Sequence, residues 1–331
     1  MPLLNGKSIL VTGATGSFGK RFVKTLLEQH DPKRVIAFSR DELKQYEMQQ
    51  NIQSPKLRFF LGDVRDKERL YRAIDGIDIV VHAAAMKQVP ASEFNPMEAV
   101  KTNIIGAENV INVCIDQGVK NVIALSTDKA ANPANLYGAT KLCSDKLFIA
   151  ANALSERHHT RFSVVRYGNV IGSRGSVVPF FMQRRASGVI PITDPRMTRF
   201  WITLGQGVRF VIDSFDRMRG GEIFVPKIPS MKVTDVAQVV APDCKTEVIG
   251  IRPGEKLHEI MITQDDAINT AEFDTHYTIQ PAAYWWNQTK FIKETGARPV
   301  AENFQYSSDS NPVWMTREQF ADILKHETLE L

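Results

Sequence analysis

A glycine-rich turn close to the start of the sequence constrains the fold of this chain more than any other feature. The turn runs from Gly13 to Gly19 with the spacing Gly-x-x-Gly-x-x-Gly, follows the apolar run Ser8–Val11 and opens an amphipathic segment. A strand, a glycine turn and a helix in this order are typical of a site where free helix N–H groups bind a dinucleotide pyrophosphate. The alternative is a glycine turn without a ligand. The residues expected to contact the cofactor here are Gly13, Thr15, Gly16, Ser17, Phe18 and Gly19.

Short apolar runs alternate with helical patterns over the first half of the chain. The predicted strands are Lys7–Val11, Arg34–Ser39, Leu57–Leu61, Ile79–His82, Asn121–Ser126 and Arg161–Arg166. The predicted helices are Phe18–Gln29, Asp41–Asn51, Lys67–Ile74, Asn95–Gln117 and Ala134–Leu154. Because the strands are continuously apolar, they predict an α/β fold with a Rossmann-type, doubly wound parallel sheet that is buried on both faces.

The regular alternation ends after Arg166, where prolines, glycines and arginines become frequent. We expect a Rossmann domain over residues 1–168 and a smaller, mixed α/β lobe over residues 169–331 that closes over the substrate. The predicted helix Gly205–Met218 and strand Glu222–Val225 are expected to return to the main sheet. The segment near 204–226 is therefore expected to belong with the Rossmann domain.

Composition limits the classes of function. The chain has 331 residues and a net charge of +4, with lysines and arginines spread along it rather than gathered in a basic tail. We therefore expect no nucleic-acid partner, although the small basic excess suits an anionic small molecule. The three cysteines form no Cys-x-x-Cys pair, and neither a signal peptide nor a membrane-spanning run is present, so we expect a cytoplasmic protein. The histidines form no metal-binding pattern, and no metal site is predicted.

Two neighbouring motifs carry the candidate chemistry. Tyr137 and Lys141 are four residues apart and share one face of a predicted helix. The ammonium would lower the pKa of the phenol and hold a cofactor ribose, and a phenolate is a suitable base for a sugar hydroxyl. Asp128 and Lys129 lie just upstream and offer a second acid and a second base. The alternatives are a packed core tyrosine and a solvated turn.

The end of the second predicted strand bears on the choice of cofactor. Ser39 and Arg40 offer a hydroxyl and a guanidinium, which suit the 2′-phosphate of NADP. Asp41 and Glu42 follow at once and would serve NAD if the strand ended later. NADP is therefore the favoured cofactor, and NAD is the alternative.

Ligands of doubly wound sheets bind beyond the carboxyl ends of the strands, and several polar segments lie at such ends. Asp63, which follows the third predicted strand, is expected to accept from the adenine amino group, or to cap the helix that begins near Lys67. The further residues expected to contact the cofactor are Lys44, Val64, Ala83, Ala84, Lys87, Tyr137 and Lys141.

The glycine turn together with Tyr137 and Lys141 resembles the extended short-chain dehydrogenase/reductases. Four further stretches resemble, within that group, the inverting UDP-N-acetylglucosamine 4,6-dehydratases of pseudaminic acid biosynthesis. They are Ala83–Pro90, Ser126–Ala130, Arg166–Ser176 and Arg252–Lys256. The Asp128-Lys129 pair is the most specific part, because related dehydratases that retain the C5 configuration carry Asp-Glu there. Related capsule enzymes tend to carry Met where this chain has Tyr137.

The resemblance implies a reaction without net oxidation. Tyr137 would remove the C4 hydroxyl proton while hydride passes to the nicotinamide, and Thr127 would hydrogen-bond the C4 oxygen. Lys129 would remove the acidified C5 proton, which requires a lowered pKa, and protonated Asp128 would assist loss of the C6 hydroxyl as water. The hydride then returns to C6. Reprotonation of C5 from the opposite face, by Lys129, would invert that centre.

The same resemblance implies UDP-N-acetylglucosamine as substrate and a homo-oligomer, either a dimer or a hexamer. The residues expected to bind the substrate are Lys87, Asn169, Val170, Arg174, Arg199, Arg252 and Glu255, with the arginines as diphosphate ligands and Glu255 paired with ribose hydroxyls or with Arg252. Two other functions remain open. A nucleotide-sugar 4-epimerase or reductase would need Tyr137 and Lys141 only, and a cofactor-sensing protein would need neither pair.

Overall fold

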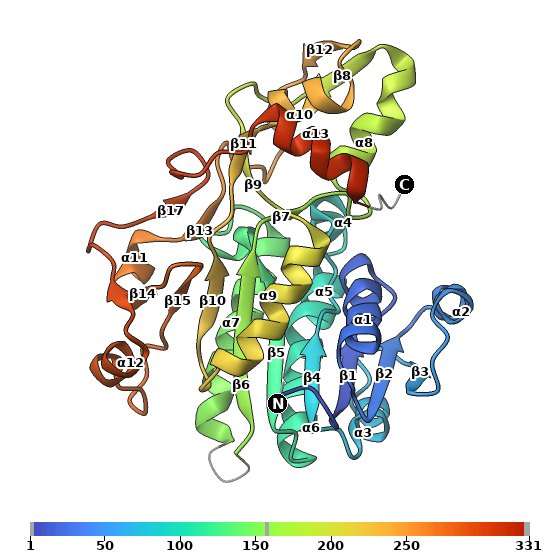
Figure 1. Cartoon of the computed structure of the whole chain (residues 1–331), viewed down its shortest axis with the longest axis vertical. Coiled ribbons are helices and arrows are strands. Elements are labelled where there is room, and N and C mark those ends of the chain that lie inside the picture. Colours follow the sequence, from blue (N-terminus) through green and yellow to red (C-terminus); the bar gives the residue numbers. More distant parts are fainter. Residues whose placement is uncertain (1–2, 156–158, 328–331) are drawn as a thin grey trace.

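A large sheet forms the centre of the computed structural model, which describes residues 3–155 and 159–327 (Figure 1). The sheet has ten strands in the order β16-β14-β15-β10-β6-β5-β4-β1-β2-β3. Its parallel part comprises β1 (Ser8–Thr12), β2 (Arg34–Ser39), β3 (Leu57–Leu61), β4 (Ile79–His82), β5 (Asn121–Thr127), β6 (Arg161–Tyr167) and β10 (Ile223–Pro226). The antiparallel edge comprises β14 (Thr270–Glu272), β15 (His276–Ile279) and β16 (Arg298–Pro299). The predicted Rossmann-type α/β class is confirmed.

Helices cover both faces of this sheet. On one face α1 (Ser17–Gln29) packs against α9 (Leu204–Arg217), and on the other α3 (Lys67–Ile74), α6 (Gly106–Asp116) and α7 (Leu136–Leu154) pack side by side (Figure 1). The helix α2 (Glu42–Asn51) connects β2 to β3. Since both faces are covered, the strands need apolar side chains on both sides, and every residue of β1 and β4 is buried.

The predicted helix Asn95–Gln117 is interrupted. The structure divides this segment into α5 (Pro96–Val100), a π-helical turn η1 (Lys101–Ile105) and α6. The turn directs Asn103 at the loop after β4, where its amide donates to the carbonyl of Met86 and accepts from the N–H of Met86. A π-helical turn breaks the 3.6-residue repeat, so the sequence pattern alone does not reveal it.

The second half of the chain does not form one continuous unit. The helix α9 and the strand β10 lie against the main sheet, where β10 pairs in parallel with β6. The later strands β14, β15 and β16 extend the same sheet, so part of the stretch expected to form the lobe also lies on it. The boundary at residue 168 remains a prediction.

Most of the remaining elements gather beyond the carboxyl ends of the parallel strands, whereas α12 (Gln288–Thr295) lies beside the antiparallel edge of the sheet (Figure 1). The others are α4 (Val89–Phe94), η2 (Asp128–Ala130), β7 (Asn169–Val170), α8 (Val177–Arg184), η3 (Arg185–Ser187), β8 (Val189–Ile192), β9 (Thr198–Ile202), β11 (Ser230–Lys232), α10 (Val233–Val240), β12 (Lys245–Val248), β13 (Ile260–Ile262), α11 (Gln264–Ala267), β17 (Tyr306–Ser307) and α13 (Arg317–His326). Several of them enclose a separate apolar core around Phe181, Trp201 and Phe320. This core makes the upper part of the molecule a distinct packing unit.

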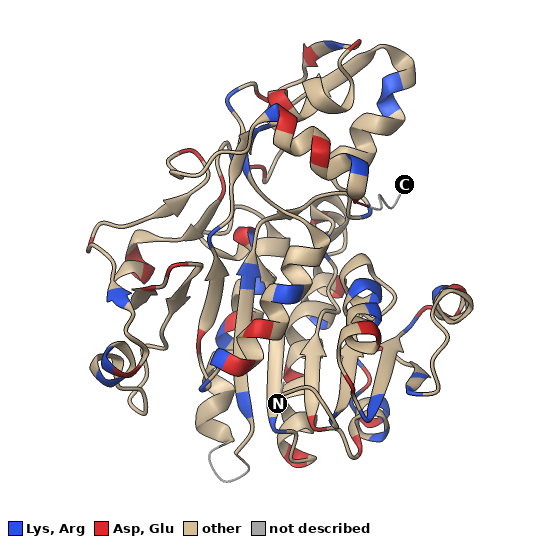
Figure 2. Cartoon of the chain, in the orientation of Figure 1, with Lys and Arg blue, Asp and Glu red and all other residues tan. Residues whose placement is uncertain are grey.

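Charged side chains are spread over both parts of the molecule, with basic and acidic residues interspersed (Figure 2). Within residues 3–155 and 159–327, the structure contains no helix with the length and apolar character needed to cross a bilayer.

Candidate active site

A cavity of about 650 Å³ opens at the carboxyl ends of the parallel strands, between the sheet and the upper unit. Every residue that the sequence predicts for cofactor binding lines this cavity, as do Thr127, Asp128 and Lys129. Asn169, Val170 and Arg174 of the predicted substrate set line it too. The sequence missed other lining residues, among them Gln88, Thr102, Tyr167, Ser173 and Ser176. The two motifs that suggested the function therefore share one cavity.

The glycine turn packs closely against the backbone that follows β4 and leaves the start of α1 open to the cavity. Gly13 has φ of +65°, and a Cβ added there would lie 2.8 Å from the backbone nitrogen of Ala84. The helix α1 begins after Gly16 without a side-chain cap, and its first turn has no acidic residue. Its N–H groups and the positive end of its dipole therefore suit an anion such as a pyrophosphate.

The end of β2 is the next part of the cavity wall. The strand ends at Ser39, whose carbonyl and hydroxyl both accept from the amide of Gln45 at 3.0 Å. Asp41 caps α2 by accepting from the N–H of Lys44 and also pairs with the Lys44 ammonium at 2.8 Å. The exposed guanidinium of Arg40 lies 3.8 Å from Asp63. Ser39, Arg40 and Asp41 all line the cavity, but the Asp41 carboxylate is engaged within its own helix.

Asp63 does not cap a helix. The side chain that caps α3 is Asp66, which accepts from the N–H of Arg69 at 2.9 Å. Asp63 instead pairs with the guanidinium of Arg65 at 2.7 Å, and this hydrogen bond helps to hold its pKa below the usual value in spite of partial burial. The capping alternative for Asp63 was therefore wrong, because the helix begins one turn later than Asp63 would require.

The strand β5 and the helix α7 bring the catalytic candidates together. β5 ends at Thr127, and the short helix η2 places Asp128 and Lys129 beside Tyr137 in the first turn of α7. The Thr127 hydroxyl donates to Asp128 Oδ1 at 2.8 Å, and the Lys129 ammonium donates to the same oxygen at 3.1 Å. Asp128 is buried, with its side chain 1% exposed. Two separate motifs of the sequence thus line one side of the cavity together.

Lys129 lies between two carboxylates. Its Nζ is 3.1 Å from Asp128 Oδ1 and 3.1 Å from Glu259 Oε1. Burial favours the neutral amine, but Asp128 and Glu259 outweigh burial and raise the pKa of Lys129 above its ordinary value. The sequence-based expectation of a lowered Lys129 pKa was therefore wrong, because it followed from the demand of the reaction and did not include the two carboxylates, of which Glu259 is remote in the chain.

Glu259 comes from a distant part of the chain and precedes β13. Its own N–H donates to the hydroxyl of Ser308 at 2.9 Å, and its carbonyl accepts from the N–H of Ser308 at 2.8 Å. Arg199 reaches Glu259 from β9, with its Nε 3.8 Å from Oε1. The sequence did not connect Glu259 with Lys129, because Glu259 follows the last of the four resembling stretches and is remote from Lys129 in the chain.

The pKa of Tyr137 differs from the expectation that Lys141 would lower it. Burial raises the pKa of Tyr137 to about 12, and the cation that most opposes this rise is Lys129 rather than Lys141. Lys141 is buried, which lowers its pKa, while Asp145 acts in the opposite direction. Tyr137 is therefore a neutral phenol near pH 7 and needs a proton acceptor before it can act as a base.

A buried ion pair supports α7 from behind and was missed by the sequence reading. Arg166 Nη2 lies 3.3 Å from Asp145 Oδ2, which also accepts from the hydroxyl of Ser126 at 2.7 Å. Asp145 is two helical turns beyond Tyr137 and one beyond Lys141, so it shares their face. The pair fixes α7 against β5 and β6.

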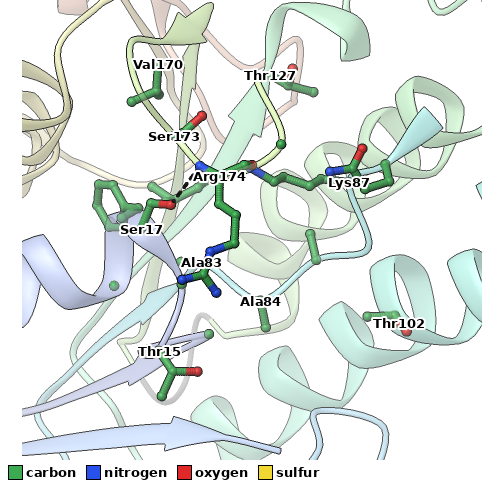
Figure 3. A pocket seen from close by; sticks show the side chains of 18 of the residues that line it. Thr15, Ser17, Ala83, Ala84, Lys87, Thr102, Thr127, Val170, Ser173 and Arg174 are labelled. Atoms are coloured by element: carbon green, nitrogen blue, oxygen red, sulfur yellow. Dashed lines mark hydrogen bonds between the residues drawn. The ribbon is translucent and has the colours of Figure 1, made fainter. Parts of the chain in front are cut away.

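The loop that follows β7 reaches across the cavity. The N–H of Arg174 donates to the Ser17 hydroxyl at 3.4 Å, and its carbonyl accepts from the Lys87 ammonium at 3.3 Å. The Arg174 side chain extends toward Ala83, on the side of the glycine turn (Figure 3). Asn169 lines the same cavity and has a buried side-chain oxygen without a hydrogen-bond partner within the described part of the chain. This loop contacts the glycine turn directly and partly covers it.

Three residues of the predicted substrate set do not line the cavity. Arg199 is buried and donates to the carbonyls of Thr198 and Leu257 as well as approaching Glu259. Arg252 and Glu255 lie in an exposed loop, with Nη1 3.9 Å from Oε1. Glu255 was expected to pair with ribose hydroxyls or with Arg252, and in the structure it pairs with Arg252.

Gly138 allows η2 and α7 to approach closely, and replacing it by alanine should separate them. A Cβ at Gly138 would lie 2.1 Å from the carbonyl oxygen of Lys129. We expect Gly138→Ala to reduce the free energy of unfolding by about 1–3 kcal/mol, because backbone must move to make room. Denaturant unfolding measures this loss. Gly207→Ala in α9 is the control, since the nearest atom there is a side-chain carbon at 3.9 Å; an equal effect of both changes would contradict the prediction.

Comparison with known proteins agrees with the fold and the site. Residues 9–281 match the family described as polysaccharide biosynthesis protein. A UDP-N-acetylglucosamine 4,6-dehydratase (inverting) of Campylobacter jejuni is 57% identical over 98% of this chain and 99% of its own length. A UDP-glucose 4-epimerase of Rickettsia canadensis is 39% identical over 91% of each chain. The crystal structure of Pen from Bacillus thuringiensis superposes with a TM-score of 0.89 at 35% identity, over 99% of this chain and 100% of that one.

Proposed function

The chain belongs to the polysaccharide biosynthesis protein family of extended short-chain dehydrogenase/reductases, and from this we propose that it is an inverting UDP-N-acetylglucosamine 4,6-dehydratase. The observation that carries the proposal is that Asp128, bonded to Thr127 and to Lys129, lines the same cavity as Tyr137 and Lys141. Such a group combines one base for alcohol oxidation with a second acid and a second base for elimination. The product would be a 4-keto-6-deoxy sugar nucleotide suited to pseudaminic acid-type synthesis.

In this proposal the tyrosine and its neighbours act on C4 of the sugar. Tyr137 as phenolate takes the proton of the C4 hydroxyl, and Thr127 hydrogen-bonds the C4 oxygen. The buried ammonium of Lys141 lies on the same helical face, one turn along, and stabilises negative charge on the phenol as well as holding the ribose of the cofactor. Asp145 and Arg166 keep this face in position.

The Asp128–Lys129 pair then acts on C5 and C6. Lys129 in its base form removes the C5 proton, and Glu259 Oε1, 3.1 Å away, helps to set the pKa at which that form appears. Asp128 in its protonated form gives a proton to the C6 hydroxyl, which leaves as water. Protonation of C5 on the face opposite to the one that lost its proton completes the inversion.

The cofactor in this proposal is NADP. The uncapped N-terminus of α1, which lines the cavity, suits its pyrophosphate. Ser39 and Arg40 suit its 2′-phosphate, while Asp41 is engaged in capping α2. When bound, the nicotinamide supplies the hydride acceptor for C4 oxidation and the hydride donor for C6.

The choice of NADP leads to a test at Arg40. We expect Arg40→Ala to weaken the binding of NADP by about ten- to a hundred-fold. A charge-assisted hydrogen bond to the phosphate contributes roughly 1.5–3 kcal/mol to the binding free energy. The affinity for NAD should be nearly unchanged. Fluorescence titration with both cofactors measures the ratio, and Arg58→Ala, an exposed arginine on β3, is a control. Equal losses for both cofactors would show that Arg40 does not contact the 2′-phosphate.

Incubation of the protein with UDP-N-acetylglucosamine and NADP tests the reaction itself. Mass spectrometry should show loss of water, and proton NMR should show the inverted C5 configuration. A 4-epimerase is the second candidate, because relatives with that name are 39% identical. It would give UDP-N-acetylgalactosamine without loss of mass, so one spectrum separates the two functions.

The substrate contacts and the assembly also belong to the proposal. Lys87, Asn169, Val170 and Arg174 line the cavity and are the residues that we propose for the UDP-sugar. Arg199 supports Glu259 in addition to any contact with the diphosphate. Arg252 and Glu255 would have to move with their loop to reach the substrate. We propose a homo-oligomer, as the resemblance implies.

A further inference from the structure

The loop that joins β7 to α8 lies against the start of α1. The N–H of Arg174 donates to the hydroxyl of Ser17, the first residue of α1, at 3.4 Å. The carbonyl of Arg174 accepts from the ammonium of Lys87 at 3.3 Å. Gly172 and Gly175 have φ of +71° and +72°, a conformation that glycine adopts easily, and turn the chain on both sides of Arg174. The backbone therefore fixes Arg174 between the glycine turn and the loop that follows β4.

The side chain of Arg174 points into the part of the cavity that faces the glycine turn. Figure 3 shows it extending from beside Ser17 toward Ala83, on the side where Thr15 lies. Within residues 3–155 and 159–327, the hydrogen bonds of Arg174 are both made by its backbone. Its guanidinium therefore has all five N–H donors available for a ligand.

The surroundings of this guanidinium are basic. The helix α1 begins there with uncapped N–H groups and no acidic residue in its first turn, so the positive end of its dipole faces the cavity. Lys87 adds a second positive charge on the other side of Arg174. Among the described residues, the acidic side chains that line the cavity all pair with other basic residues, Asp41 with Lys44, Asp63 with Arg65 and Asp128 with Lys129. An anionic ligand would balance the positive charges at the glycine turn.

We propose, resting on the cofactor-dependent function above, that the guanidinium of Arg174 binds the pyrophosphate of the dinucleotide on the side opposite to α1. The N–H groups of α1 contact the pyrophosphate from one side. The planar guanidinium donates two parallel hydrogen bonds to phosphate oxygens from the other side. The loop of residues 172–176 then covers the pyrophosphate, and the cofactor leaves only after this loop has moved.

This placement suits a reaction in which the cofactor is regenerated in every turnover. Hydride taken from C4 returns to C6, so the proposed dehydratase has no need to exchange its cofactor between turnovers. Asn169 and Val170, which we propose for the UDP-sugar, form β7 directly before the loop. One short segment therefore reaches both ligands, and the remaining N–H donors of Arg174 are available to the UDP-sugar.

Titration with NADP in the absence of sugar tests the contact, because no UDP-sugar then competes for Arg174. We expect Arg174→Ala to weaken the binding of NADP by about ten- to a hundred-fold, which is the effect of losing a charge-assisted phosphate contact. The rate of NADP release should rise by a similar factor, since affinity differences of this kind lie mainly in dissociation. Fluorescence titration and stopped-flow displacement measure the two quantities. Arg184→Ala, at an exposed arginine on α8, is the matched control and should change neither.

A shorter ligand locates the contact on the cofactor. Adenosine 2′,5′-bisphosphate keeps the 2′-phosphate of NADP and a single 5′-phosphate, but it has no pyrophosphate. Arg174→Ala should weaken its binding far less than that of NADP, whereas Arg40→Ala should weaken the two ligands alike.

An unchanged affinity of Arg174→Ala for NADP would overturn the inference, and a raised KM for UDP-N-acetylglucosamine in the same variant would assign Arg174 to the sugar nucleotide alone. Equal losses of NADP and of the bisphosphate would overturn it as well. Failure of the unmodified protein to release water from UDP-N-acetylglucosamine would instead overturn the proposed function and leave the binding result in place.

Discussion

Replacing Lys129 by alanine is expected to abolish dehydration while leaving the cofactor bound. Lys129 contacts Asp128 and Glu259, and the glycine turn that would hold the pyrophosphate lies elsewhere in the cavity. Loss of a general base or acid lowers rates by about 100- to 10,000-fold. Both water loss and deuterium uptake at C5 in heavy water should fall by this factor, because the same side chain acts on the C5 proton. Mass spectrometry and NMR of the product measure the two quantities.

Removing Lys129 also leaves the buried carboxylates of Asp128 and Glu259 facing each other, so Lys129→Met, which keeps the length of the side chain, should be measured as well. Lys146→Ala changes an exposed lysine on α7 and should retain full turnover. Undiminished deuterium uptake at C5 in both Lys129 variants would show that another group handles that proton.

Replacing Glu259 by glutamine is expected to move the pH dependence of the C5 step. Burial lowers the pKa of Lys129, and Asp128 and Glu259 together raise it above the ordinary value. The base form of Lys129 therefore appears only as the pH rises toward this raised pKa. Loss of one carboxylate lowers the pKa, so the rising limb of deuterium uptake at C5 should shift to lower pH by roughly one to three units.

The shift separates an electrostatic role of Glu259 from a purely structural one. Glutamine preserves the shape and the backbone contacts with Ser308, whereas the charge next to Lys129 and Arg199 is lost. Asp128, Tyr137, Arg199 and Lys256 remain beside Lys129 and set the residual pKa. Glu247→Gln on the exposed strand β12 is the control. A profile that falls in height without moving along the pH axis would show that Glu259 does not set the protonation of Lys129.

The strands of the parallel sheet could be predicted almost residue by residue. A strand that is covered on both faces must be apolar throughout, so β2 and β4 begin and end where the sequence places them. The segment 95–117 could not be predicted in the same way. Its apolar pattern is continuous, but the π-helical turn at 101–105 forms because Asn103 bonds the backbone of Met86, and this contact exists only in the folded chain.

The candidate site was predictable where its geometry is local. Tyr137 and Lys141 share a helical face through their spacing alone, and Asp128 and Lys129 are neighbours in the chain. The protonation of these groups was not predictable, because it depends on residues that arrive through the fold. Glu259 helps to raise the pKa of Lys129, which was expected to be lowered. Burial raises the pKa of Tyr137, which was also expected to be lowered. A sequence reveals which acids and bases are present, whereas their charge depends on neighbours that are remote in the chain.

The anchoring of Glu259 by Ser308 has a consequence for the order in which the protein becomes functional during its synthesis. The glycine turn, Tyr137 and Lys129 all leave the ribosome well before Glu259, and Glu259 leaves before the Ser308 backbone and hydroxyl that hold it. Every residue that lines the cavity is therefore synthesised before Glu259, the second carboxylate beside Lys129. A ribosome that stalls before Ser308 would carry all of the cavity-lining residues but not the segment that anchors Glu259.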